Sequence, residues 1–209
     1  MVYGLLFSTN NIMKNNKIVL FDLDSTLITC DSLKKFTLFL LFKDLNKFFL
    51  KIPSLIIIII QHFISISEHK TKTKSKFFQK ILKDYSSKQI KKFSIEFANY
   101  IFSKYKNKKI YSKLLKAKKH KTEIYIVTAS ADFYCKYIAK LFQTKLISTK
   151  VSLNKKSFGK IIGKNCYGIE KKIRVLKDIK NFKDKYSIFY TDSKSDRYLM
   201  KICDKSYLL

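Results

Sequence analysis

Two aspartates separated by one residue are the side chains in this chain best suited to chemistry. Asp22 and Asp24 follow the short apolar run 18–21, and Thr26 comes two residues later. In an extended chain two such carboxylates point the same way, whereas in a tight turn one can face a substrate while the other reaches the leaving group. This arrangement suits a nucleophile and a proton donor. An Asp-rich turn or a helix cap is the alternative interpretation of the same residues.

The elements that would position these residues belong to an α/β sheet. Four short apolar runs suit buried parallel strands, with helical stretches between them: residues 18–21, 124–127, 187–190 and 206–209. Asp22, Thr128 and Asp192 each lie within two residues of the end of such a run. Because ligands of open parallel sheets bind beyond the carboxyl ends of the strands, we expect these three side chains to meet at one edge of the sheet.

About a hundred residues between the first two runs do not resemble sheet. Apolar residues recur there at helical spacing, and Ser86 with Gln89 suits a capping box at a helix start. We therefore predict a Rossmann-like parallel sheet core made of residues 13–33 and 106–209. A helical cap, residues 34–105, is inserted between these two parts.

The first part of the predicted cap, residues 36–66, is strongly apolar. Its longest uncharged run, residues 52–67, is 16 residues long, shorter than the roughly 18 or more expected of a membrane-spanning helix. Three interpretations stay open: buried core helices of the cap, a helix lying in the membrane interface, and a membrane span or re-entrant hairpin. In a membrane-bound chain, the lysines that follow directly would contact anionic headgroups: Lys70, Lys72, Lys74 and Lys76.

The chain of 209 residues is strongly basic, with 44 lysines and arginines against 15 aspartates and glutamates and a formal net charge of +29. Only Arg174 and Arg197 are arginines. Since base readout in nucleic acids favours arginine forks, we expect no nucleic-acid partner. We expect the lysines to cover solvent-exposed faces, with an anionic membrane surface as a further candidate partner.

The cysteines and histidines form no zinc or disulfide motif. The four cysteines are widely spaced without a Cys-x-x-Cys pair, and the three histidines have no partners at motif spacing. Reduced thiols and a cytoplasmic location are therefore expected. If segment 36–66 binds a membrane, the protein would instead be associated with the inner face of the cytoplasmic membrane.

Four ordered motifs together resemble the haloacid dehalogenase-like phosphohydrolase superfamily, over residues 18–209. They are Asp22-x-Asp24-x-Thr26, Thr128 at a strand end, Lys171 near a helix start, and Asp192-x-x-x-Asp196. The stretches 126–130, 159–171 and 190–196 are closer to the phosphoserine phosphatase-like subgroup, subfamily IB. The resemblance implies an enzyme that hydrolyses phosphomonoesters.

By this resemblance Asp22 is the nucleophile and forms an aspartyl-phosphate, and Asp24 is the general acid and then the general base. Two acids facing a phosphate dianion require a divalent cation, and an all-oxygen site suits Mg²⁺. The implied metal ligands are the Asp22 carboxylate, the Asp24 main-chain carbonyl and Asp192.

The other motif residues would bind substrate or support the site. Thr128 would donate a hydrogen bond to a phosphate oxygen, and Lys171 would set a positive charge against the phosphate, with Lys172 as the alternative lysine. Asp196 would hold Lys171 or a water on the metal, unless it only caps a surface helix. Thr26 would brace the first turn.

Three positions depart from the pattern of the resembled family. Ser25 replaces the glycine common after the second aspartate, and Thr191 replaces the glycine common before Asp192; neither change removes a ligand. Asp31 stands where phosphoserine enzymes of the subgroup carry a substrate-reading glutamate. We take Asp31 as a candidate substrate-binding residue.

The apolar cap and Asp31 together resemble the phosphatidylglycerophosphate phosphatases of bacterial phospholipid synthesis. A membrane lipid phosphate is therefore the first candidate substrate. A soluble phosphomonoester, such as a phosphorylated amino acid or amino alcohol, is the alternative among enzymes. From another class, a non-catalytic module that binds an anionic membrane through its lysines is the third hypothesis.

Overall fold

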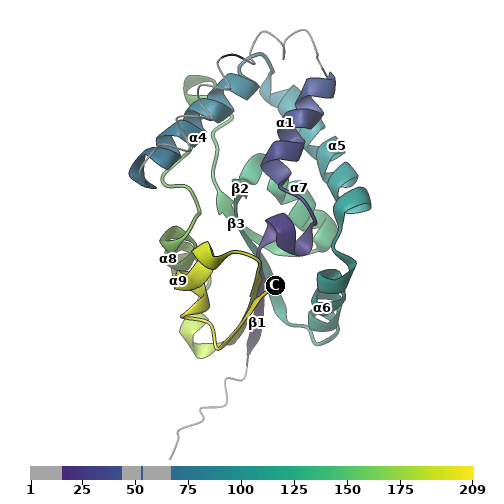
Figure 1. Ribbon diagram of the computed structural model, residues 1–209, viewed down its shortest axis with the longest axis vertical. Coiled ribbons are helices and arrows are strands. Elements are labelled where there is room, and N and C mark those ends of the chain that lie inside the picture. Colours follow the sequence, from purple (N-terminus) through teal and green to yellow (C-terminus); the bar gives the residue numbers. More distant parts are fainter. Residues whose placement is uncertain (1–15, 44–52, 54–66) are drawn as a thin grey trace, which may run out of the picture.

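The structure is a computed structural model, and it describes residues 16–43, 53 and 67–209. At its centre is a five-stranded sheet of parallel strands in the order β3-β2-β1-β4-β5. Figure 1 labels three of these strands, β1, β2 and β3. The strands are β1 Lys17–Phe21, β2 Glu123–Ala131, β3 Lys145–Thr149, β4 Tyr186–Thr191 and β5 Lys205–Leu208. The predicted α/β class and the four predicted strands are confirmed.

Two strands add to the sequence prediction. β3 has only Leu146 and Ile147 as apolar residues, so it does not stand out as a strand in the sequence; it forms as a parallel partner of β2. β2 is longer than expected, because it continues beyond Thr128 with a register shift between Val127 and Ala131. Thr128 therefore lies inside an irregular strand end and not after the strand.

Helices cover both faces of the sheet (Figure 1). They are α1 Ser32–Lys43, α4 Ser67–Leu82, α5 Ser87–Tyr105, α6 Lys108–Lys119, α7 Asp132–Phe142, α8 Ile169–Asp178 and α9 Arg197–Met200. Successive residues of β1 point to opposite faces, so Val19 and Phe21 enter one apolar cluster while Ile18 and Leu20 enter the other. The central strands are thus buried on both sides.

The predicted capping box forms at the start of α5. Ser86 Oγ accepts a hydrogen bond from the Gln89 N–H at 3.2 Å, and Gln89 Oε1 accepts one from the Ser86 N–H at 2.8 Å. These two bonds satisfy backbone donors that a helix start leaves without partners. They fix the point at which the chain turns from α4 into α5.

The helices α1, α4 and α5 of the predicted cap share one apolar core with the sheet and α7. Phe36 of α1 lies 5.1 Å from Phe97 of α5 between ring centroids. The same ring lies 5.3 Å from Phe133 and 4.9 Å from Tyr134, both in α7. A single buried cluster therefore runs from the predicted cap into the sheet.

Of the apolar segment 36–66, only residues 36–43 and 53 are described. In α1, Phe36 and Leu40 are buried, whereas Leu38 and Phe42 are exposed, Phe42 to 78%. The rest of the segment, and with it the choice among the three interpretations, lies outside the described residues. Within the described ranges, none of the helices is long and apolar enough to cross a membrane.

The two segments that connect the predicted cap to the sheet run side by side. Ile28 and Lys106 form an antiparallel bridge. The Thr29 N–H also donates a hydrogen bond to the Tyr105 carbonyl at 2.8 Å. The chain therefore leaves and rejoins the core at one place, near the predicted cap boundaries at residues 34 and 105.

Helix α4 packs closely on the loop between β3 and α8. The Ile161 N–H donates to Ser75 Oγ at 3.0 Å. Gly159 has a φ of +77°, and a Cβ at this position would lie only 2.6 Å from Gln79 Cα. Glycine is required here by both the backbone angle and the close approach of the helix.

We expect Gly159→Ala to lower the free energy of unfolding by about 2–4 kcal/mol, because it adds a backbone clash to the cost of a left-handed residue. Gly163→Ala is the matched control, since Gly163 has a φ of +73° but no atom within 4 Å of an added Cβ. The control should lose only about 1–2 kcal/mol. Urea denaturation measures both, and equal losses would contradict the close packing of α4 on this loop.

Candidate active site

Asp22 lies at the carboxyl end of the central strand. Phe21, the last residue of β1, pairs with β2 on one side and β4 on the other. The Asp22 N–H continues this pairing, because it donates to the Tyr190 carbonyl at 2.9 Å. Thr128 and Asp192 lie at the ends of the two flanking strands. The sheet therefore brings the three side chains to one edge, as the sequence predicts.

The turn that follows Asp22 is tight and is tied to the end of β4. In the turn Leu23–Leu27, Ser25 has a φ of 54°. This left-handed angle costs a serine about 1–2 kcal/mol, which gives the physical reason for the glycine common at this position in the resembled family. Thr26 Oγ1 accepts a hydrogen bond from the Asp192 N–H at 3.1 Å and donates one to Asp192 Oδ1 at 3.2 Å. Thr26 thus connects the first motif with the last.

A buried triad of charges joins three of the motifs. Lys171 Nζ lies 2.9 Å from Asp22 Oδ1 and 2.8 Å from Asp196 Oδ2, and the lysine side chain is only 3% exposed. These contacts are made by Lys171 and not by the alternative, Lys172. Burial would lower the pKa of Lys171, but the charges of Asp22 and Asp196 outweigh burial and raise that pKa above its usual range. Lys171 is therefore a fixed positive charge beside Asp22.

Asp196 is held in the triad from a second side. Thr191 Oγ1 donates to Asp196 Oδ2 at 2.7 Å, so the threonine that replaces a glycine contributes a hydrogen bond to the site. Asp196 precedes α9, but its side chain makes no capping hydrogen bond and is fully buried, which argues against the surface-cap interpretation. Its other oxygen, Oδ1, is buried and has no hydrogen-bond partner among the described residues.

Asp24 accepts a short hydrogen bond on each of its two oxygens. The Ser32 N–H donates to Oδ1 at 2.7 Å, and Ser130 Oγ donates to Oδ2 at 2.6 Å. Burial raises the pKa of Asp24, while the hydrogen bonds from the two serines oppose this rise. A raised pKa favours the protonated form that a proton donor needs.

The two other candidate substrate contacts, Thr128 and Asp31, lie in different surroundings. Thr128 is buried, and its Oγ1 accepts the Ser130 N–H at 3.0 Å, which leaves its own O–H as a donor. Asp31 lies at the start of α1, where its Oδ1 accepts the Lys34 N–H at 2.9 Å, and its side chain is 46% exposed. Asp31 thus caps a helix, and its contact with substrate stays a prediction.

The carboxylates at this edge of the sheet fit a divalent cation. Burial raises the pKa of Asp22 to about 7; the charges of Asp196 and Asp24 add to the rise, and Lys171 opposes it. An ionised Asp22 therefore needs more positive charge than Lys171 provides, and Asp196 Oδ1 remains an unpartnered acceptor. Such oxygen donors suit Mg²⁺.

The predicted ligand set is two carboxylates, Asp22 and Asp192, and one carbonyl, that of Asp24. Over residues 16–43, 53 and 67–209, the structure has no group of three His, Cys, Asp or Glu side chains arranged to hold a metal. A set with only two side-chain ligands is compatible with this finding. All four cysteines are free in the structure.

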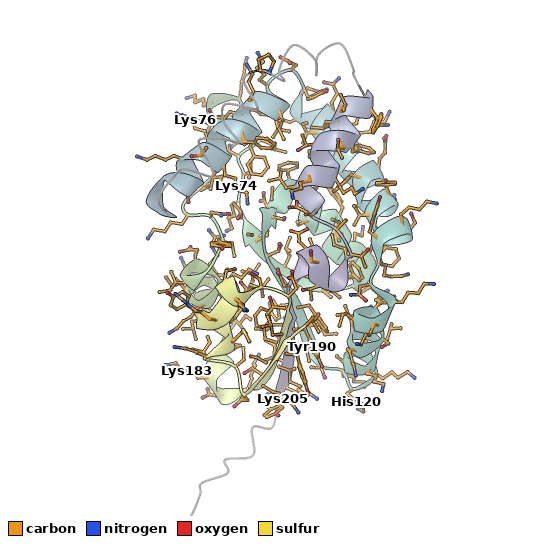
Figure 2. The ribbon with its side chains drawn as sticks, in the orientation of Figure 1. Lys74, Lys76, His120, Lys183, Tyr190 and Lys205 are labelled. Atoms are coloured by element: carbon orange, nitrogen blue, oxygen red, sulfur yellow. The ribbon has the colours of Figure 1, made fainter. Side chains whose placement is uncertain are left out.

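A lysine of the predicted cap lies beside the segment that carries Thr128. Lys74 belongs to the row of lysines predicted to face headgroups, but Figure 2 shows it on the side of α4 that faces the sheet. Its Nζ donates to the Ala129 carbonyl at 2.8 Å and to Asn165 Oδ1 at 3.1 Å. Burial lowers the pKa of Lys74. The row of lysines is therefore not one exposed surface, because Lys74 contacts the segment that carries Thr128.

Two serines that contact Asp24 are absent from the sequence-based site. Ser130 comes two residues after Thr128, and residues two apart in a strand share a face, so the spacing could have pointed to it. Ser32 gives no comparable signal, since it is an ordinary residue at a helix start. Its contact with Asp24 arises from the way α1 meets the sheet edge.

The site thus consists of two carboxylates and a buried lysine at the carboxyl edge of a parallel sheet. The chain matches the haloacid dehalogenase-like hydrolase family over residues 19–201. It therefore belongs to this family, and it is a phosphomonoester hydrolase, as the four sequence motifs indicate. No curated protein matches the chain.

Solved structures share the fold at low sequence identity. A protein with unknown function from Bordetella pertussis Tohama I is 19% identical, with a TM-score of 0.75 over 92% of this chain and 89% of that one. A phosphoserine phosphohydrolase-like protein from Francisella tularensis is 18% identical, with a TM-score of 0.59 over 92% and 86%. A substrate-bound phosphoserine phosphatase is 17% identical, with a TM-score of 0.57 over 91% and 84%. These likenesses confirm the fold.

We expect Lys171→Met to lower the free energy of unfolding by about 3–5 kcal/mol, because it leaves two buried carboxylates without their cation. Lys172→Met, one residue further along α8, is the matched control and should change stability by less than about 0.5 kcal/mol. Urea denaturation of the two variants measures the difference. A Lys171→Met protein as stable as the unmodified chain would contradict the ion-pair triad.

Proposed function

We propose that the protein is a Mg²⁺-dependent phosphomonoester phosphatase that works through an aspartyl-phosphate. The observation that carries this proposal is the ion pair of Asp22 with Lys171 at the end of β1, with Asp24 in the tight turn that follows. The lysine would bind phosphoryl oxygens beside the nucleophile, and Asp24 would reach the leaving group. Family membership supports a hydrolase, and the phosphoserine phosphatase of similar fold supports phosphate esters as substrates.

In the first step, a carboxylate oxygen of Asp22 attacks the phosphorus atom of the ester. The bond between phosphorus and the ester oxygen breaks, and Asp24 gives its proton to that oxygen. An alcohol leaves, Asp24 becomes a carboxylate, and the phosphoryl group stays on Asp22. Lys171 and the Thr128 hydroxyl stabilise the negative charge of the phosphoryl oxygens during the transfer.

In the second step, Asp24 acts as the base. It removes a proton from a water molecule, whose oxygen attacks the phosphorus atom. The bond between phosphorus and the Asp22 oxygen breaks, so inorganic phosphate leaves and Asp22 is a carboxylate again. Asp24 is protonated at the end of this step, and the cycle can restart.

The cation would be held by the carboxylates of Asp22 and Asp192 and by the Asp24 carbonyl. When bound, Mg²⁺ offsets the repulsion between these acids and the phosphate dianion. Within the chain, Thr26 orients Asp192 through its two hydrogen bonds. Lys171 keeps Asp22 in place through its ion pair.

As substrate we favour a membrane lipid phosphate such as phosphatidylglycerophosphate. Helix α1 exposes Leu38 and Phe42 where the apolar segment 36–66 begins. The net charge of +29 would attract the chain to an anionic membrane surface. A substrate of this kind would place the enzyme at the inner face of the cytoplasmic membrane.

A soluble phosphomonoester is the second candidate substrate. Phe36 and Leu40 are buried, so the described start of the apolar segment also serves as packing of the cap. The similar fold of a substrate-bound phosphoserine phosphatase favours the same alternative. The non-catalytic module is less well supported, because Asp22, Lys171 and Asp196 are all present and in contact.

We expect Asp22→Asn to lower kcat by about 10³-fold or more, because an amide cannot form the aspartyl-phosphate. The measurement is phosphate release with Mg²⁺, from phosphatidylglycerophosphate in mixed micelles and from a panel of soluble phosphomonoesters. Asp178→Asn, which changes an exposed carboxylate of α8, is the matched control and should keep full activity.

Faster turnover of the lipid would support the membrane substrate, and faster turnover of a soluble ester would support the second candidate. Asp22→Asn activity close to that of Asp178→Asn would overturn the nucleophile assignment. Phosphate release from none of the substrates by the unmodified chain would overturn the proposed function itself.

Removal of divalent cations with EDTA should abolish phosphate release, because the carboxylates would then repel the substrate dianion. Added Mg²⁺ should restore the activity, and dialysis without a chelator is the control for handling losses. Full activity in excess EDTA would contradict the predicted ligand role of Asp22, Asp24 and Asp192.

A further inference from the structure

The carboxyl group of Asp24 is held from two elements that are far apart in the sequence. The Ser32 N–H, at the start of α1, donates to Oδ1 at 2.7 Å. Ser130 Oγ, at the end of β2, donates to Oδ2 at 2.6 Å. With one bond to each oxygen, the plane of the carboxyl group is fixed, and its position depends on both elements.

The serine that contacts Oδ2 is itself part of a buried chain of hydroxyl groups. Ser32 Oγ donates to Ser130 Oγ at 2.9 Å, and Ser32 Oγ lies 3.4 Å from the Tyr134 hydroxyl. Ser130 is 4% exposed, and Ser32 and Tyr134 are fully buried. Because a buried hydroxyl without partners is costly, the three groups hold one another in a single arrangement.

The same serine also contacts the predicted phosphate-binding residue. The Ser130 N–H donates to Thr128 Oγ1 at 3.0 Å. Ser130 therefore contacts both Thr128, the proposed phosphate-binding residue, and Asp24, the proposed proton donor.

We propose that Ser130, supported by Ser32, is a positioning residue that orients the Asp24 carboxyl group toward the leaving-group oxygen. A carboxyl group has about four lone-pair sites on its two oxygens, and the serines occupy one on each. A proton can therefore sit on Oδ2 while both hydrogen bonds stay in place. The inference rests on the proposed phosphatase function, and it assigns Ser130 no contact with the substrate.

If Ser130 has this role, the effect of its loss on the rate depends on whether the leaving group needs a proton. An alkoxide must receive a proton as it departs, so alkyl phosphates depend on a well-placed acid. The p-nitrophenolate ion leaves readily without a proton. If Asp24 loses its orientation, hydrolysis of alkyl phosphates should therefore slow much more than hydrolysis of p-nitrophenyl phosphate. A general loss of structure would slow the hydrolysis of both substrates alike.

The experiment compares kcat/KM on these two kinds of substrate, because kcat/KM covers only the steps up to transfer of the phosphoryl group to Asp22. We expect Ser130→Ala to lose about 10- to 100-fold on the alkyl phosphomonoester that the unmodified chain hydrolyses best, within the 10² to 10⁴ that a general acid contributes. On p-nitrophenyl phosphate the loss should stay below about 3-fold. Ser94→Ala is the matched control, since Ser94 is a buried serine of α5 whose hydroxyl donates to the Ile90 carbonyl of the same helix.

Ser32→Ala is the second variant, and it keeps the test open if Ser130→Ala does not fold. It retains the Ser32 N–H bond to Asp24 and removes only the hydroxyl that supports Ser130. We expect the same selective loss with a smaller factor. Equal losses on both substrates, or no loss on either, in the folded variants would overturn the inference. If the unmodified chain hydrolyses neither substrate, the proposed function fails instead.

Discussion

The ion pairs of buried Lys171 with Asp22 and Asp196 are the interaction on which the site depends. The three residues come from α8, the end of β1 and the segment after β4, and Lys171 lies 149 residues from Asp22 in sequence. Since an isolated buried charge is strongly unfavourable, each residue requires the other two in place. The ion pairs therefore form only when β1, β4 and α8 are in their places in the fold, and they help to hold these elements together.

The two motif carboxylates occupy different surroundings although only one residue separates them. Asp22 faces an ammonium group, whereas Asp24 faces a serine hydroxyl and a backbone N–H. Lys171 opposes the rise that burial causes in the pKa of Asp22, whereas the hydrogen bonds to Asp24 hold a carboxyl group that can carry a proton. The turn with Ser25 in a left-handed conformation causes this difference in surroundings, because it directs the side chains of Asp22 and Asp24 to different partners.

The sequence predicts those parts of the site that depend on strand ends and motif spacing. Asp22, Thr128 and Asp192 follow apolar runs, so their meeting at one edge follows from the rules of parallel sheets. The contacts of Ser32 with Ser130 and of Lys74 with Ala129 join residues 98 and 55 positions apart, and they arise from helix packing that periodicity does not reveal. The inward turn of Lys74 is hidden in particular, because lysines are so common in this chain.

The apolar cluster that runs from Phe36 and Phe97 into Phe133 and Tyr134 bears on how the chain folds. The helices α1, α4 and α5 lie between β1 and β2 in the sequence, yet their rings and those of α7 cover each other. Deleting the insertion would leave a large aromatic face in water. These helices and the sheet thus share one core, and a chimaera that exchanged the helices with those of a relative would also have to exchange the matching residues of α7.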